Sequence, residues 1–122
     1  MARTPQGFPR PARLTRPSEF RRVFAHPRRS SDRYLTVLAA PNDLGHPRLG
    51  LAISRKVSPR AVERNRIKRL IRERFRHLQA ELGNLDFVVI GRHGLTQLPA
   101  AQLNEILERH WKRLSRQSGN AS

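Results

Sequence analysis

The chain lacks several residue types on which other classes of protein depend. It has no cysteine, which excludes a disulfide framework, a thiolate metal site and a cysteine nucleophile. No segment approaches the roughly 20 consecutive apolar residues of a membrane span. The N-terminus also lacks the apolar stretch of a secretory signal. We therefore expect a soluble, cytoplasmic protein with no membrane partner.

Acidic residues are scarce, and this deficit dominates the electrostatics. The 122 residues include 25 Lys and Arg against 9 Asp and Glu, for a formal charge of +16. Such a charge repels itself unless a polyanion compensates it, so nucleic acid is the leading partner. Of the cations 22 are Arg, whose planar fork binds phosphate bidentately and stacks on bases. A GC-rich genome would produce the same bias, which therefore carries little weight.

The length fits one domain with a modest core. Residues 1–12 contain three prolines among Arg and Gly and are interpreted as a flexible basic arm. Residues 13–117 form the predicted folded domain, and residues 118–122 are expected to be a disordered polar tail.

Hydrophobic periodicity predicts three helices. A short amphipathic helix carries Phe20, Val23 and Phe24 on one side. A long helix is predicted over 58–82, between a Ser-Pro start and a Gly-Asn stop. A last helix begins at Pro99 and has one apolar side.

Three strands are predicted between these helices. The segments 34–40 and 48–57 flank a turn cluster, so they are expected to be neighbouring antiparallel strands. The compact apolar run 85–90 is predicted to be a buried strand. Because side chains alternate along a strand, each of the first two has a core face and an opposite face. The core-facing residues are Leu35, Val37, Ala39, Leu49, Leu51 and Ile53, and the opposite face carries Tyr34, Thr36, Leu38, Gly50, Ala52, Ser54 and Lys56.

The long helix has an apolar side, which is expected to face the core, and an opposite side rich in cations. Its apolar arc comprises Ile67, Leu70, Ile71, Phe75, Leu78 and Leu82, and the opposite arc comprises Asn65, Arg66, Lys68, Arg69, Arg72 and Arg76. Most charge runs are merely solvated helix faces, but only Glu63 and Glu73 are available to compensate this one. Arg64 and Arg74 fall within the apolar arc, so we expect Arg64 near the open N-terminal end and Arg74 to extend outward.

The segment SRKVSPRAVERNRIKRLIRERFR closely resembles the signature of the bacterial ribonuclease P protein family, whose RNR motif corresponds to residues 64–66. The aromatic N-terminal helix, the Arg-Leu-Gly-Leu segment 48–51 and the strand 86–90 extend the resemblance over residues 13–116. It implies a small single-domain α+β sandwich of order α-β-β-β-α-β-α, ribosomal protein S5 domain 2-like. The implied four-stranded sheet has a left-handed βαβ crossover, against the general rule.

The resemblance implies the protein subunit of an endoribonuclease that removes 5′ leaders from precursor tRNA, with catalytic groups on its RNA subunit. That RNA would contact Arg64, Asn65, Arg66, Lys68, Arg69 and Arg72. The leader would lie in a cleft formed by Phe20, Phe24, Tyr34, Thr36, Ala52, Ser54 and Lys56, where rings stack on bases. For Phe20 and Phe24 an ordinary core role is equally open.

No catalytic constellation is evident in the chain itself. The five histidines, His26, His46, His77, His93 and His110, show no ligand spacing and are expected at the surface. Hydrolysis would then depend on Mg²⁺ held mainly by the RNA subunit, with Asn65 a candidate contact to a hydrated ion. The expected partners are this RNA and precursor tRNA, and the free protein is expected to be a monomer.

Two other functions fit the same composition. A ribosomal-protein-like structural RNA-binding protein, without a role in tRNA processing, would share the charge and the small α/β build. A stand-alone nuclease is disfavoured because no acidic metal site is apparent.

Overall fold

The structure is a computed structural model that describes residues 12–120, with side chains to residue 116. The elements are α1 (Pro17–Ala25), β1 (Arg28–Ser31), β2 (Leu35–Pro41), β3 (Arg48–Ala52), α2 (Ala61–Leu78), η2 (Gln79–Glu81), β4 (Leu85–Gly91), η3 (Leu95–Gln97) and α3 (Ala100–Asn120). This is the α-β-β-β-α-β-α order that the resemblance implies. In the described part of the chain, none of the helices combines the length and apolar character needed to cross a membrane.

The predicted terminal segments are only partly covered by the described residues. Of the predicted arm, residues 1–11 lie outside them. Helix α3 continues to Asn120, past the predicted start of the tail at residue 118.

The four strands form one mixed sheet in the order β1-β2-β4-β3. Strand β2 pairs antiparallel with both β1 and β4, whereas β3 and β4 are parallel. The prediction that 34–40 and 48–57 are neighbouring strands is therefore wrong, because β4 lies between them. A parallel pair needs a long crossover, which α2 provides between β3 and β4. The apolar run of β4 suits a central strand that is covered on both faces.

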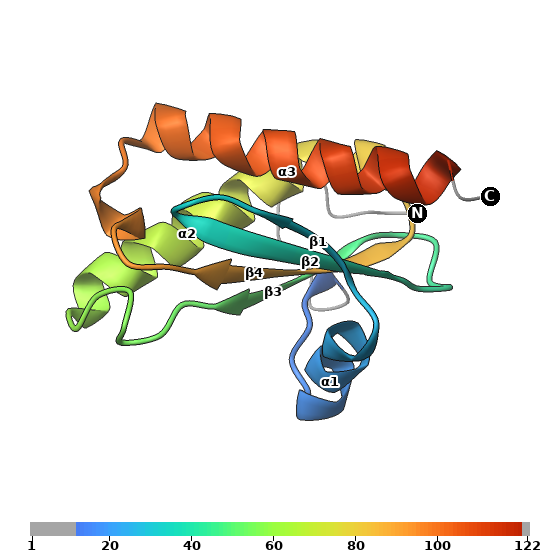
Figure 1. Ribbon diagram of the computed structural model, residues 1–122, viewed down its shortest axis with the longest axis horizontal. Coiled ribbons are helices and arrows are strands. Elements are labelled where there is room, and N and C mark those ends of the chain that lie inside the picture. Colours follow the sequence, from blue (N-terminus) through green and yellow to red (C-terminus); the bar gives the residue numbers. More distant parts are fainter. Residues whose placement is uncertain (1–11, 121–122) are drawn as a thin grey trace, which may run out of the picture.

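Helices α2 and α3 cover one face of the sheet, and α1 lies on the other (Figure 1). The core between the sheet and the two long helices is centred on Phe75, Phe87 and Trp111. Their rings meet edge to face at centroid distances of 5.3 to 6.5 Å. The predicted core residues of the strands and of both long helices are buried here, except for Leu51 and Leu70, which are partly buried.

Helix α1 packs a smaller cluster onto the opposite face. Val23 is fully buried, beside Leu38 and Val88 of the sheet and with the ring of Phe20 at the margin. A Cβ on Gly50 would lie 2.7 Å from Phe20 Cε1. Glycine in β3 therefore lets this ring lie directly on the strand.

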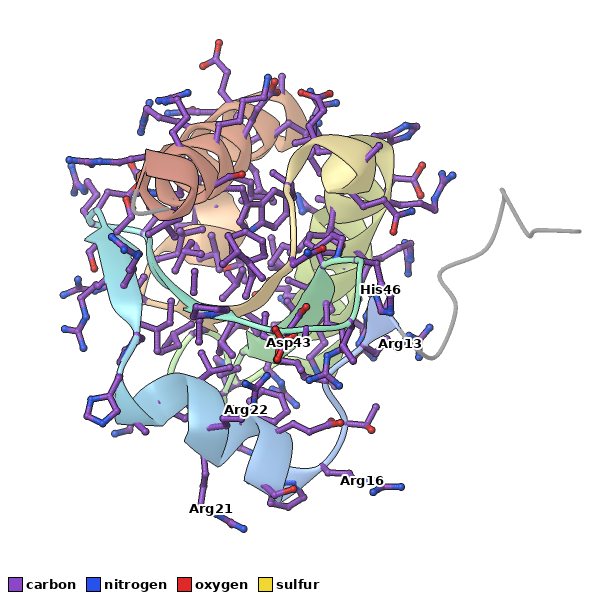
Figure 2. All side chains as sticks on the ribbon, turned by 90° about the vertical axis from the view of Figure 1, so that its right-hand side faces the viewer. Arg13, Arg16, Arg21, Arg22, Asp43 and His46 are labelled. Carbon is purple, nitrogen blue, oxygen red and sulfur yellow. The ribbon has the colours of Figure 1, made fainter. Side chains whose placement is uncertain are left out.

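A buried carboxylate ties α1 to the sheet. Asp86 is inaccessible to solvent and accepts hydrogen bonds from Arg48 (2.7 and 2.9 Å), Arg22 (2.6 Å) and Asn42 (2.8 Å). Figure 2 shows Arg22 between α1 and the sheet, whereas Arg21 points away from both. Burial acts to raise the pKa of Asp86, but the hydrogen bonds from Arg48 and Asn42 outweigh it and hold the pKa below its ordinary value.

Candidate nucleic-acid interface

The exposed side of α2 gathers the predicted cations around one depression. Asn65, Lys68, Arg69 and Arg72 recur at helical spacing and line a hollow of about 340 Å³, together with Glu73 and Arg76. Arg66 is exposed on the adjacent flank of the helix. These side chains therefore form a continuous surface, which we call the α2 cationic face: Asn65, Arg66, Lys68, Arg69 and Arg72.

Carboxylates compensate other cations of α2 but not those of this face. Arg74 extends outward, as expected, to Glu108 of α3 (2.6 Å), and Arg76 pairs with Glu73 (2.5 Å). All nine Asp and Glu residues belong to the described part of the chain. Within it, none of them lies within 4 Å of the four cations of the α2 cationic face. The positive charge of this face is left for an external anion.

Arg64, which was also predicted to contact RNA, does not belong to the α2 cationic face. Its Nη1 atom donates to the carbonyl oxygen of Ser58 (2.9 Å), and the side chain is half-buried near the N-terminal end of α2. Ser58 Oγ in turn donates to Glu63 (2.6 Å). Arg64 thus helps to hold the turn that precedes the helix, and its predicted contact with RNA stays a prediction.

The second surface is a row of the sheet that α1 leaves uncovered. Thr36, Ile90 and Ala52 are cross-strand partners, and all three are partly exposed. Ser31 continues the row on β1, and its hydroxyl donates to Thr36 Oγ1 (3.0 Å). We call this open row of small and weakly polar side chains the sheet cleft.

The two predicted phenylalanines lie on one flank of α1. Glu19 and Arg22 bind the sheet from the opposite flank. Helical spacing puts Phe24 on the same flank as Phe20, and Phe20 packs against the small core that Ile90 also borders. Phe20 is half-buried and belongs to the small core, whereas Phe24 is 48% exposed. Phe20 therefore has a core role, and Phe24 has none.

Tyr34 does not lie on the face of the sheet for which it was predicted. Its side chain packs at the margin of the core beneath α2 and α3 and lines a separate pocket beside α3. The expectation that it shares a face with Thr36 is therefore wrong, because Tyr34 precedes β2 and lies in the turn after β1, where strand alternation does not apply. Ser54 and Lys56 are exposed in the loop after β3, where Ser54 Oγ accepts from the Lys56 backbone N–H (3.2 Å).

A small pocket of about 170 Å³ lies where Phe20 of α1 comes near the α2 cationic face. It is lined by Arg13, Leu14, Thr15, Phe20, Leu49, Leu51, Lys68 and Arg72. Burial and, second, the positive charge of Arg13 lower the pKa of Arg72. Sequence reasoning did not single out Arg13. It is positioned by a contact distant in sequence, since the next residue, Leu14, donates its N–H to the Leu49 carbonyl (2.9 Å).

His110 is buried in the structure, contrary to its prediction. Its ring is hydrogen-bonded to Ser30 (2.6 Å) and Asp32 (2.8 Å), so its predicted surface position is wrong.

No group of three His, Asp or Glu side chains in the described residues could hold a metal ion. Asn65 lies among cations, whose charge opposes binding of Mg²⁺ there.

The fold and its uncompensated cationic face define a small, basic α+β protein suited to binding a polyanion. Comparison with known proteins agrees with this class. A sequence model of the family described as Ribonuclease P matches residues 8–115. The ribonuclease P protein component of Methylococcus capsulatus is 56% identical over 116 residues, covering 95% of this chain and 91% of the relative. That of Photorhabdus laumondii is 51% identical, covering 87% and 89%.

Solved structures show the same similarity at the level of the fold. The RNase P protein of Staphylococcus aureus has a TM-score of 0.77 at 30% identity, over 83% of this chain and 93% of that one. The protein of Thermotoga maritima has a TM-score of 0.75 at 30% identity, over 83% and 96%. This chain belongs to the ribonuclease P protein family and is a protein subunit of the endoribonuclease ribonuclease P. The family assignment decides against the ribosomal-protein-like alternative.

Proposed function

We propose that the α2 cationic face binds the RNA subunit of ribonuclease P. The observation that carries the proposal is its unpaired charge: Arg66, Lys68, Arg69 and Arg72 share one helix side, and no carboxylate of the described chain lies within 4 Å of them. Closely spaced cations of this kind neutralise the phosphates of a folded RNA and release its counterions. Asn65 adds an amide that both donates and accepts hydrogen bonds.

The sheet cleft is proposed to hold the 5′ leader of precursor tRNA. The side chains that form its floor are mostly small, and the aromatic rings of Phe20 and Phe24 are proposed to border it. Base–aromatic stacking contributes about 1–3 kcal/mol per base and tolerates any sequence, as a variable leader requires. Lys56 and Ser54, which are exposed just beyond β3, are the proposed polar contacts.

The protein is proposed to supply affinity and substrate discrimination, while Mg²⁺ bound to the RNA subunit supplies the hydrolytic chemistry. The described residues do not suit a protein-held Mg²⁺, since Glu73, the acidic group beside Asn65, already binds Arg76 and His77. The holoenzyme is proposed to work in the cytoplasm, with one monomer of the free protein joining the RNA.

The test is the salt dependence of RNA-subunit binding. Arg66→Ala with Arg69→Ala removes two exposed cations of the α2 cationic face. Each lost phosphate contact should reduce the slope of log affinity against log salt by about 0.7–0.9. A filter-binding titration of the double variant should therefore show a slope smaller by about 1.5 and weaker binding at low salt.

The matched control is Arg113→Ala with Arg116→Ala, which removes the same charge from exposed positions of α3. Its slope should stay close to that of the unmodified protein. Equal slopes for the two double variants would mean that net charge, and not the α2 cationic face, governs the affinity.

A further inference from the structure

A second pocket lies at the end of the sheet, outside both proposed surfaces. It encloses about 570 Å³ between the β1–β2 turn, η3 and the start of α3. We call it the Tyr34 pocket; its lining is Arg33, Tyr34, His93, Gly94, Gln97, Leu98, Pro99 and Gln102. No carboxylate lines it, so its charged groups favour a neutral or anionic ligand.

The lining combines an aromatic ring with polar groups. The ring of Tyr34 is partly exposed, and the guanidinium carbon of Arg33 lies 5.3 Å from its centroid. Gln97 and Gln102 are exposed, and their amides both donate and accept hydrogen bonds, as the edges of a nucleobase require. Arg33 and His93 are exposed at the same pocket and can approach a phosphate. A ring, two amides and a guanidinium suit a nucleotide better than an apolar ligand.

The position of the pocket relates it to the sheet cleft. Tyr34 lies in the turn that leads into β2 and precedes Thr36 of the sheet cleft by two residues. On β4, Arg92 follows Ile90 by two residues, and its backbone N–H donates to the Tyr34 carbonyl (2.9 Å). Arg92 is exposed, and its side chain donates to the Asp32 carbonyl oxygen (3.3 Å) in the turn that also carries Tyr34, so Arg92 links the end of the sheet cleft to that turn. A single strand of RNA that leaves the cleft over this end of the sheet meets a cation and then an aromatic pocket.

We propose that the Tyr34 pocket binds an unpaired nucleotide of the precursor leader, farther from the cleavage site than those in the sheet cleft. The base takes the place that the Arg33 guanidinium occupies over the Tyr34 ring and meets the amides of Gln97 and Gln102. The displaced Arg33, together with Arg92, contacts the backbone phosphates. The inference rests on the proposed binding of the leader in the sheet cleft, and it makes a longer leader a better ligand.

The test uses the reconstituted holoenzyme and precursors whose leaders are lengthened one nucleotide at a time. Affinity should rise in two stages, first as the sheet cleft fills and then as the Tyr34 pocket fills. Tyr34→Ala should abolish the second stage, a loss of about tenfold for long leaders, and leave short leaders and mature tRNA unchanged. Tyr34→Phe keeps the ring and should keep both stages.

Tyr34 also packs against the core, so a second variant guards against a folding defect. Gln102→Ala, at an exposed position, should weaken only the second stage. If holoenzymes with Tyr34→Ala and Gln102→Ala bind every precursor as tightly as the unmodified holoenzyme does, the pocket is not a leader site. The same conclusion follows if the two variants lose the same affinity for all precursors and for mature tRNA. If affinity shows no dependence on leader length at all, the proposed function of the sheet cleft fails as well.

A direct readout is available because Tyr34 is the single tyrosine of the chain. Full-length protein labelled with 3-fluorotyrosine gives one ¹⁹F resonance. Titration with a long single-stranded oligoribonucleotide should shift it, and a short one that fills only the sheet cleft should not. An unmoved resonance at saturation with the long strand would overturn the proposal.

Discussion

Phe20 and Phe24 lie one turn apart on α1 yet differ in what each can tell about the sheet cleft. Phe20 covers Gly50 and belongs to the small core, so its truncation would alter folding as well as binding. Phe24 is 48% exposed and offers a cleaner measurement. This difference was not predictable from their i, i+4 spacing, which left core and cleft equally open, because burial depends on how far along the sheet α1 lies.

Phe24→Ala should weaken precursor binding by the holoenzyme by about 1–3 kcal/mol, the cost of one lost stack. Mature tRNA carries no leader, so its affinity should not change. Leu44→Ala is the control, since Leu44 is equally exposed, at 48%, in the loop between β2 and β3. A loss shared by both RNAs would place Phe24 outside the leader site.

Asp86 is the residue on which the attachment of α1 depends. Asp86→Asn keeps the shape but removes the charge that pairs with Arg48 and Arg22, and breaking a buried pair costs about 3–5 kcal/mol. Urea denaturation should show this loss at neutral pH, and Asp43→Asn, an exposed change in the β2–β3 loop, should show none.

The same carboxylate predicts a pH dependence. Its pKa is held below the ordinary value in the folded protein, so its contribution is complete above the ordinary pKa of an unfolded Asp. That contribution is lost as the pH falls through the folded value. Acid should therefore narrow the gap in free energy of unfolding between the unmodified protein and Asp86→Asn, and a constant gap would contradict the role assigned to Asp86.

At the scale of elements, the sequence predicted which residues of each helix and strand are buried, but it did not predict which strands are neighbours in the sheet. The apolar arc of α2, the inward residues of β2 and β3 and the apolar side of α3 are all confirmed, because periodicity is local. The order of strands depends on contacts distant in sequence, so the insertion of β4 between β2 and β3 was not predictable from pattern. Only the family resemblance indicated a further strand, since the Arg-Arg-Ser-Ser sequence of β1 has no apolar residue.

Strand β1 is attached to α3 through polar groups instead. His110 lies between Ser30 Oγ (2.6 Å) and Asp32 Oδ2 (2.8 Å), and Asp32 also accepts the backbone N–H groups of Tyr34 and Leu35. Burial acts to raise the pKa of Asp32, but these hydrogen bonds, with that of His110 the largest, lower it overall. An edge strand without apolar residues is thereby fixed in place.

His110→Ala should destabilise the protein by about 1–3 kcal/mol, because the buried Ser30 hydroxyl loses its partner. Urea denaturation measures the difference. His26→Ala, at an exposed position, should change the stability by no more than about 0.5 kcal/mol. Equal unfolding midpoints for the two variants would show that β1 is held by its pairing with β2 alone.

At the scale of the whole molecule, the fold places several of its few carboxylates where they hold elements together, and none of those in the described residues pairs with the cations of the α2 cationic face. Asp86 secures α1, Asp32 secures β1, and Glu108 joins α3 to α2. The remaining positive charge is the property that the sequence predicted most directly. The positions of the α2 cationic face, the sheet cleft and the pocket beside Phe20 required the structure, because α1 and the segment before it reach the sheet through contacts distant in sequence.

This arrangement predicts that the free protein gains stability from salt. A net charge of +16 repels itself in the compact state, and at about 0.15 M salt the Debye length falls to roughly 8 Å, so that repulsion between distant charges is screened. The melting temperature should therefore rise from low to physiological ionic strength, by roughly 4 °C for each kcal/mol of repulsion relieved. Arg113→Glu with Arg116→Glu replaces two positive charges by two negative ones, which lowers the net charge from +16 to +12. The melting temperature of this variant should rise less with salt than that of the unmodified protein. A melting temperature that falls with salt would mean that ion pairs such as Arg74 with Glu108 outweigh the repulsion, and that the protein is not strained by its charge in the absence of RNA.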